Sequence, residues 1–169
     1  MWSSVWLAVR SVIWAIVFPG MVAGYIPWRF FGIGGATIDL TSPAHAFGLA
    51  CITAGASMLA WCIFEFARRG RGTLSVFDPT RRLVVRGLYR YVRNPMYLSV
   101  TMIVLGEAVV AGSKPLVIYW AVFFAAANVF VIAYEEPDLR RKFGASYDEY
   151  TRRVGRWIPS LNEHDGASG

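Results

Sequence analysis

Two groups of polar side chains in this sequence could bind a charged ligand. The first is the segment from Arg93 to Tyr97, Arg-Asn-Pro-Met-Tyr, which opens an apolar stretch. Proline favours the first turn of a helix, whose free N–H groups attract anions, and an arginine beside it can grip a carboxylate. The second is the pair Glu135 and Glu136, with Asp138 close by, at the end of the next apolar stretch. Carboxylates accept hydrogen bonds from hydroxyl or ammonium groups.

The two groups stand at the feet of one predicted helical hairpin. Only a short turn, Gly112 to Pro115, separates the two apolar stretches. Cations at one foot and acids at the other suit a zwitterionic ligand that carries a diol, and S-adenosylmethionine is such a molecule. Two simpler interpretations stay open: Arg93 serves membrane topology, and the paired glutamates only balance nearby arginines.

The composition indicates a membrane protein. Of 169 residues, 56% are hydrophobic and 17% are charged. A soluble domain of this size would expose a large apolar surface, so composition excludes an ordinary globular protein, a disordered chain and a disulfide scaffold. The predicted fold class is an all-α integral membrane protein with four transmembrane helices, the last two forming the hairpin. The predicted spans cover about 5–26, with a kink at Pro19-Gly20, and 45–66, 95–112 and 115–135.

The distribution of charge predicts the orientation of these spans. The loop of residues 67–94 carries eight arginines and one aspartate, whereas Arg29 is the one basic residue of the 27–45 loop. Because cytoplasmic loops are enriched in Lys and Arg, the basic loop is predicted to face the cytoplasm. With four spans, the N-terminus and the C-terminus then lie on the same side.

The tail after the fourth span is predicted to form cytosolic amphipathic helices over residues 136–157. Gly144 interrupts an apolar stripe at helical spacing, made by Leu139, Phe143, Tyr147, Tyr150, Val154 and Trp157. The apolar face needs a partner, which is either the membrane surface or the aromatic loop before the third span. We expect one membrane-embedded domain over residues 1–164 and a flexible C-terminus at 165–169.

The remaining polar residues give weaker signals. His45 and His164 lack Cys or acidic partners at metal spacing, so no metal site is expected. Cys51 and Cys62 lie 11 residues apart in one apolar run, too far along a helix for a disulfide. Glu107 lies inside the third span, which makes it either a functional residue or a group near the far membrane interface.

Several motifs in one order resemble a known enzyme family. They are Gly87 to Tyr97, the apolar hairpin, Glu135-Glu136, and the tail residues from Leu139 to Val154. This pattern is similar to that of the isoprenylcysteine carboxyl methyltransferase and phospholipid methyltransferase group, integral-membrane enzymes that use S-adenosylmethionine. The likeness runs from about Gly72 to Pro159, half of the chain. It is specific for the superfamily and unspecific for the substrate.

The resemblance implies site residues, written here as expectations. Arg153 would lie near the methyl acceptor and, with Glu136, would be catalytic. Asn94 stands where the family usually has His, as in many bacterial members; it cannot titrate near neutrality, so we expect no acid–base role there. We therefore expect a protein of a bacterial inner membrane. The expected cofactor-binding residues are Tyr89, Arg93, Asn94, Pro95, Tyr97, Glu135 and Glu136.

Methyl transfer from a sulfonium donor, which leaves S-adenosylhomocysteine, mainly requires alignment and exclusion of water. Our main hypothesis is that Arg93 holds the cofactor's carboxylate, a glutamate holds its ribose or ammonium group, and Arg153 orients an anionic lipophilic acceptor from the bilayer. A prenylated-cysteine carboxylate needs no base. A phospholipid amine, or a small thiol or phenol, must lose a proton, for which Glu136 or Asp138 could serve.

A second class of function remains open on sequence grounds. A non-catalytic membrane protein could use its arginines to bind membrane lipids or a cytosolic partner. In that case Arg81, Arg82 and Arg86 would matter as much as Arg93, and the paired glutamates would be dispensable. No nucleic-acid partner is expected, because the basic segment is tethered at both ends to spans. The oligomeric state is not predicted.

Overall fold

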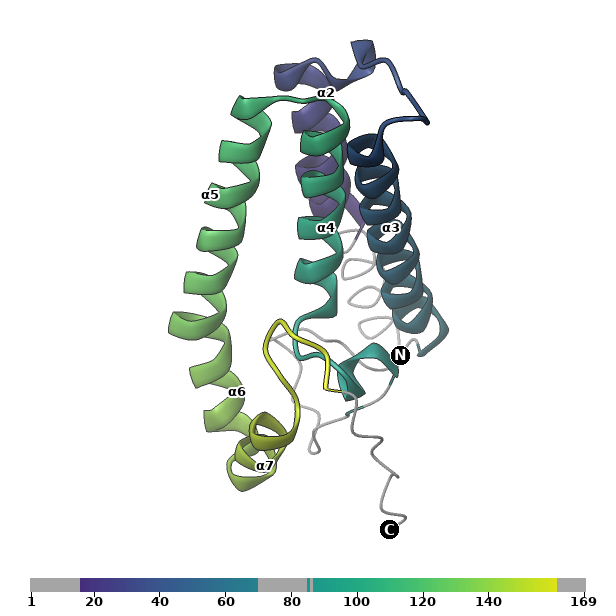
Figure 1. Ribbon diagram of the computed structural model, residues 1–169. Coiled ribbons are helices and arrows are strands. Elements are labelled where there is room, and N and C mark those ends of the chain that lie inside the picture. The colour runs from purple at the N-terminus through teal and green to yellow at the C-terminus, as the bar shows by residue number, and fades with distance from the viewer. Residues whose placement is uncertain (1–15, 70–84, 86, 161–169) are drawn as a thin grey trace, which may run out of the picture.

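The computed structural model describes residues 16–69, 85 and 87–160, and every regular element among them is a helix (Figure 1). Two helices, Pro43–Glu65 and Lys114–Phe143, are long and apolar enough to cross a membrane. The predicted all-helical class is therefore confirmed, while the count of four spans stays a prediction. Residues 5–15 of the first predicted span, most of the basic loop, and the predicted flexible end at 165–169 lie outside the described residues.

The helices that were expected to form the hairpin are α4 (Pro95–Val110) and α5 (Lys114–Phe130). Gly112, at φ +57°, turns the chain between them, and the Ser113 hydroxyl accepts a hydrogen bond from the Leu116 N–H at the start of α5. α5 continues through a π turn, η4 (Val131–Glu135), into α6 (Glu136–Phe143). About 20 residues cross the hydrocarbon, so a span that starts at Lys114 ends near Tyr134 and α6 projects beyond it.

The first described helix widens in front of a proline, and the predicted kink at Pro19-Gly20 stays a prediction. Residues 16–20 are α-helical, η1 (Met21–Tyr25) is a π turn, and α2 (Ile26–Phe31) follows, five residues beyond the predicted end. In a π turn the carbonyl of Val22 would pair with residue 27, but Pro27 has no N–H. The Tyr119 hydroxyl donates to that carbonyl instead, at 2.9 Å, and so ties this helix to α5.

The same arrangement recurs at η4, which directly precedes Glu136 and Pro137. A proline inside a helix clashes with the carbonyl four residues earlier, and a wider turn relieves that clash. The extra residue in this turn shifts the helical phase of everything that follows. This shift sets the directions in which Glu135 and Glu136 point.

α3 (Pro43–Arg69) packs very closely against α4 through glycines. A methyl group added to Gly106 would collide with the carbonyl oxygen of Gly48, and one added to Gly55 would lie 2.7 Å from the Ser99 carbonyl oxygen. Cys51 and Cys62 are buried and not bonded to each other. Small residues let two membrane helices approach to backbone contact.

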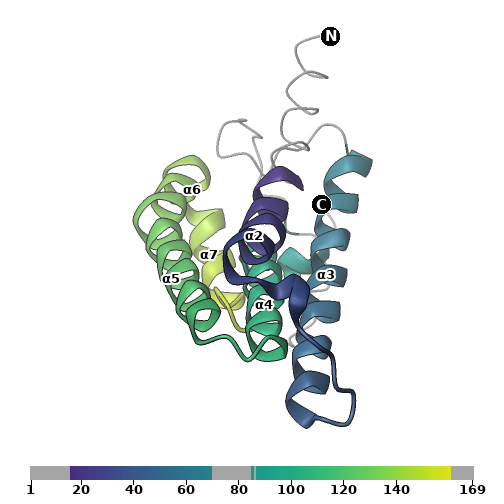
Figure 2. The same ribbon diagram turned by 90° about the horizontal axis from the view of Figure 1, so that it is seen from above.

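α4 is the central helix, although its 16 residues make it shorter than α3 and α5. Figure 2 shows it between α3 and α5, with α2 beside it. Val100, Val104 and Ala108 are almost fully buried against Val22 and Leu116 from the neighbouring helices. Because other helices cover most of its surface, a 16-residue helix can be accommodated where an isolated span of that length would be marginal.

The tail packs on the loop before α4, which is one of the two partners left open by the sequence. α7 (Ala145–Arg153) follows a break at Gly144. The last helix of the tail therefore ends at Arg153 rather than at the predicted residue 157. The N–H of Arg93 donates to the Gly155 carbonyl at 2.9 Å, and the N–H of Ser160 donates to the Tyr91 carbonyl at 2.7 Å. In Figure 1 the tail lies at the end of the molecule where α4 begins.

Candidate functional site

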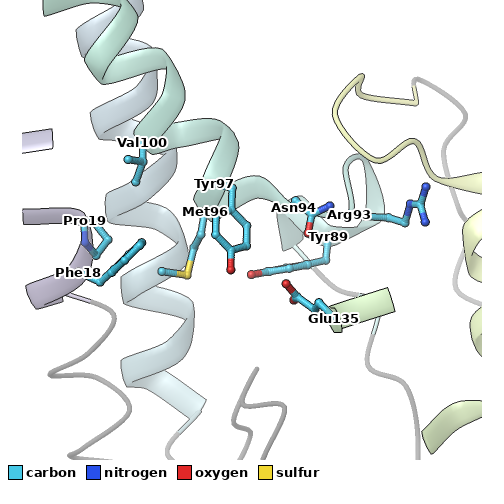
Figure 3. Close-up of a pocket in the computed structure, with 9 residues that line it drawn as sticks. All are labelled: Phe18, Pro19, Tyr89, Arg93, Asn94, Met96, Tyr97, Val100 and Glu135. Atoms are coloured by element: carbon cyan, nitrogen blue, oxygen red, sulfur yellow. The ribbon is translucent and has the colours of Figure 1, made fainter. Parts of the chain in front are cut away.

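A cavity of about 160 Å³ lies at the start of α4. Of the seven predicted cofactor-binding residues, the structure brings Tyr89, Arg93, Asn94, Tyr97 and Glu135 to its wall. Pro95 and Glu136 are sequence neighbours of these residues and do not line it. The complete described lining, drawn in Figure 3, is Phe18, Pro19, Tyr89, Arg93, Asn94, Met96, Tyr97, Val100 and Glu135.

The wall of this cavity is polar on one side and apolar on the other. Phe18, Pro19, Met96 and Val100 form the apolar side. The polar side lies where α4 begins and the α5 helix leaves its apolar stretch. Such a cavity suits a polar ligand that presents an apolar or reactive group toward the membrane.

The polar ends of Tyr89, Tyr97 and Glu135 point toward one another across the cavity (Figure 3). Tyr89 comes from η3 (Gly87–Arg90), whose first residue has φ +56° and so favours glycine. Burial, with the nearby charge of Glu135 adding to it, raises the pKa of Tyr89 well above its usual range, so the phenol stays a neutral donor.

The carboxylate of Glu135 has an open acceptor. Its Oε2 atom is buried and has no hydrogen-bond partner among the described residues. An unpaired carboxylate oxygen is costly in a folded protein, and such atoms concentrate where a ligand completes the hydrogen bonding. Glu135 is therefore the residue of this site that is best placed to accept hydrogen bonds from a ligand.

Glu136 faces the other way and is fully paired. Its Oε1 accepts from Arg93 Nη1 at 2.9 Å and from Arg156 Nε at 2.6 Å, and its Oε2 accepts from Arg156 Nη2 at 2.9 Å. Burial opposes ionisation of Glu136, but the Arg156 hydrogen bond and the charges of Arg93, Arg156 and Arg140 outweigh it and lower its pKa. A carboxylate held by two arginines is a poor general base, so this geometry does not favour the expected catalytic role.

The start of α4 is held by the tail rather than by a capping side chain. Asn94 is the residue before the helix and is 7% exposed, but its side chain makes no capping hydrogen bond. Its Nδ2 atom donates instead to the Arg156 carbonyl at 3.3 Å. Pro95 occupies the first turn, as the sequence predicts, so the N–H groups at this helix end are not capped by Asn94.

α7 packs against η3 and the loop before α4. The Tyr150 hydroxyl donates to the Tyr89 carbonyl at 2.8 Å, and Tyr147 is almost fully buried beside Arg93. Trp157 packs edge-on against Phe124 of α5, and its indole N–H donates to Asn128 Oδ1 at 2.9 Å. The tail thus forms part of the frame of the cavity.

Arg153 is not brought to the cavity. Its guanidinium is half-exposed on α7 and pairs with Glu149 one turn earlier. Sequence reasoning missed Arg156, whose signal was its position between the two stripe residues Val154 and Trp157. No group of three His, Cys, Asp or Glu side chains in the described ranges could share a metal ion.

Residues 43–146 match the phospholipid methyltransferase family, which covers more than half of the chain and reaches from the start of α3 into α7. The chain belongs to this family. Protein-S-isoprenylcysteine O-methyltransferase B of Arabidopsis thaliana is 30% identical over 121 residues, which are 69% of this chain and 59% of that protein. An uncharacterized protein of Haemophilus influenzae is 36% identical over 63 residues, 37% of this chain and 100% of its own length. No solved structure matches.

The phospholipid methyltransferase match includes the start of α4 and both glutamates, whereas Arg153 and Arg156 lie beyond it. The chain spans 59% of the length of the Arabidopsis relative. The family match therefore covers α3, the helical hairpin and most of the residues that line the cavity.

Proposed function

We propose that this protein is a membrane methyltransferase that binds S-adenosylmethionine in the cavity at the start of α4 and methylates a lipophilic acceptor. One observation carries the proposal: the Glu135 carboxylate, whose Oε2 has no hydrogen-bond partner among the described residues, faces two tyrosine hydroxyls in a cavity whose other side is apolar. Membership of the phospholipid methyltransferase family supports the same activity.

The chain's polar groups fit such a cofactor. Glu135 Oε2 is an open acceptor for ribose hydroxyls or an ammonium group, and the Arg93 Nε–H is a buried donor without a partner among the residues described. With the uncapped amides after Pro95, Arg93 would face the cofactor's carboxylate, while Tyr89 and Tyr97 would donate from the side. Each charged part of the ligand then meets a complementary group.

In this proposal the protein acts mainly by alignment. Bound S-adenosylmethionine supplies an electrophilic methyl group on a sulfonium. Glu135 places a negative charge near that centre, and the tyrosine rings keep its surroundings dry. Met96 and Val100 continue the wall toward the membrane, where an acceptor group must arrive in line with the methyl group.

For the acceptor we propose the carboxylate of an isoprenylcysteine-like lipid, which enters from the bilayer. The name of the Arabidopsis relative supports this class. A carboxylate attacks without losing a proton, so no general base is needed. The acceptor role expected for Arg153 would require it to exchange Glu149 for the acceptor's carboxylate.

A phospholipid amine is the second candidate, favoured by the description of the matched family. An amine must lose a proton before or during transfer. Glu136 is held by two arginines, and Asp138 pairs with Arg141 and Lys142. Glu135 is therefore the candidate base for an amine, or for a small thiol or phenol.

The test uses purified protein in lipid vesicles, S-adenosylmethionine with a labelled methyl group, and either an isoprenylcysteine or phosphatidylethanolamine as acceptor. A labelled product that releases volatile methanol in alkali is a methyl ester, whereas an N-methyl product keeps its label. We expect the ester. Alkali-stable label on phosphatidylethanolamine would favour the amine, and no transfer to any acceptor class from protein that binds the cofactor would contradict the activity.

A further inference from the structure

Arg156 forms the centre of the contacts that join three separate segments at the cavity. Its guanidinium binds both oxygens of Glu136, at the start of α6, in a fork geometry. Its main-chain carbonyl accepts from Asn94, the residue before α4. Arg156 does not line the cavity, so any influence on a ligand there must pass through these partners.

Glu136 links Arg156 to Arg93, because its carboxylate binds both arginines. Glu136 is 9% exposed, and its Oε1 accepts from both Arg156 Nε and Arg93 Nη1. Arg93 lines the cavity, and its own Nε–H has no hydrogen-bond partner among the described residues. While Arg156 is present, the Arg93 and Arg156 guanidinium groups share the Glu136 carboxylate, and the Arg93 Nε–H stays available to a ligand.

We infer that Arg156 is a positioning residue, which acts through Glu136 to hold Arg93 and the start of α4 in the arrangement that the cofactor needs. This inference rests on the proposed function, because it assigns Arg93 to the cofactor. Removing Arg156 leaves Arg93 as the main partner of a buried carboxylate. Arg93 is then drawn fully into that pair, whereas the main-chain carbonyl that accepts from Asn94 is kept in a side-chain variant.

The charged and titratable groups around Glu136 determine the pH at which Glu136 takes up a proton. Arg93 faces it from the loop before α4, Arg156 from the segment after α7, Arg140 from α6 and Tyr147 from α7, with Glu135 next to it in the chain. The arginines lower the pKa of Glu136. Loss of Arg156 removes the largest of these effects, so Glu136 begins to take up a proton at higher pH.

The experiment compares cofactor binding by calorimetry at pH 5.5, 6.5 and 7.5 for the intact protein, Arg156→Gln, Arg156→Lys and Glu136→Gln/Arg156→Gln. Arg152→Gln is the matched control, since it removes the same charge from an exposed position on α7. We expect at least a tenfold loss of affinity in Arg156→Gln at pH 7.5, which becomes smaller as the pH falls and Glu136 takes up a proton, and a smaller loss in Arg156→Lys. The double variant should be no worse than Arg156→Gln, and without Glu136 the ratio of its affinity to that of the intact protein should not vary with pH.

A second readout needs no cofactor. The pH at which the ligand-free protein begins to unfold in acid should rise in Arg156→Gln and stay unchanged in Arg152→Gln. If Arg156→Gln does not fold, Arg156→Lys carries both measurements. Normal affinity and an unchanged pH profile in the Arg156 variants would overturn this inference alone, whereas no binding by the intact protein would overturn the proposed function with it.

Discussion

Glu135 and Glu136 are consecutive residues of one continuous helix, and their carboxylates have opposite environments. Glu135 Oε2 is buried beside the cavity without a hydrogen-bond partner among the described residues, whereas both oxygens of Glu136 accept from arginines. One carboxylate is available to a ligand, and the other fixes the surrounding frame. Neutral substitutions at the two positions should therefore have different consequences.

Glu136→Gln should lower the stability of the protein, and Glu135→Gln should not. Removing one partner of a buried ion pair leaves uncompensated charge, which costs about 3–5 kcal/mol in typical cases. Glu135 has no ion pair with another described residue, so its neutralisation should be neutral or slightly stabilising. Thermal unfolding of both variants in the same detergent measures the difference, and equal midpoints would contradict the assignment of Glu136 to the frame.

The stability of the protein should depend on pH through Glu136. Because its pKa is lowered in the folded protein, its ionised form stabilises the fold above its unfolded pKa of about 4.3. This contribution is lost as the pH falls through the lower folded pKa. Thermal midpoints should therefore show a loss below about pH 4.5 that is reduced in Glu136→Gln. An identical acid profile in the variant would contradict this prediction.

Gly106→Ala should separate α3 from α4. The added methyl group would collide with the Gly48 carbonyl oxygen and crowd Ile52. Overpacking of this kind costs about 1–3 kcal/mol. Gly20→Ala is the control, because nothing described lies within 4 Å of its added methyl group. The thermal midpoint should fall in the first variant only; a similar fall in both would show that the close contact is unimportant.

Trp157→Phe should loosen the tail from α5. The change removes the N–H that pairs with Asn128 and leaves that amide oxygen unpaired against the helix. Side-chain hydrogen bonds between membrane helices contribute roughly 0.6 kcal/mol on average and up to about 1.7. Trp120→Phe is the matched control, since the Trp120 indole N–H is buried with no partner in the described part of the chain. Limited proteolysis of the tail should accelerate in Trp157→Phe and not in Trp120→Phe.

The sequence predicted the hairpin and the start of α4 well because local signals determine them. Pro95 sets the first turn of α4, and Gly112 supplies the positive φ of the turn. The break at Gly144 was visible for the same reason. The close approach of α3 and α4 was not, because three scattered glycines reveal contact only when the partner helix is known.

The division of roles between Glu135 and Glu136 could not be predicted from spacing. Counting residues along α5 predicts the direction of a side chain only in a regular α-helix. The π turn η4, which ends at Glu135, changes that direction at the pair. The choice between membrane and loop as partner of the tail was also open, since both are apolar and aromatic. Arg156 was missed because its main partner, Glu136, lies 20 residues away in the chain.

The most direct test of the account is calorimetric titration of the purified protein with S-adenosylmethionine, alongside Glu135→Gln. The predicted result is saturable binding by the intact protein and a loss of about tenfold or more in Glu135→Gln, whose thermal stability is unchanged, because a charged hydrogen-bond acceptor contributes roughly 1.5–3 kcal/mol. Equal affinity of the two proteins, or no binding by the folded intact protein in lipid, would contradict it.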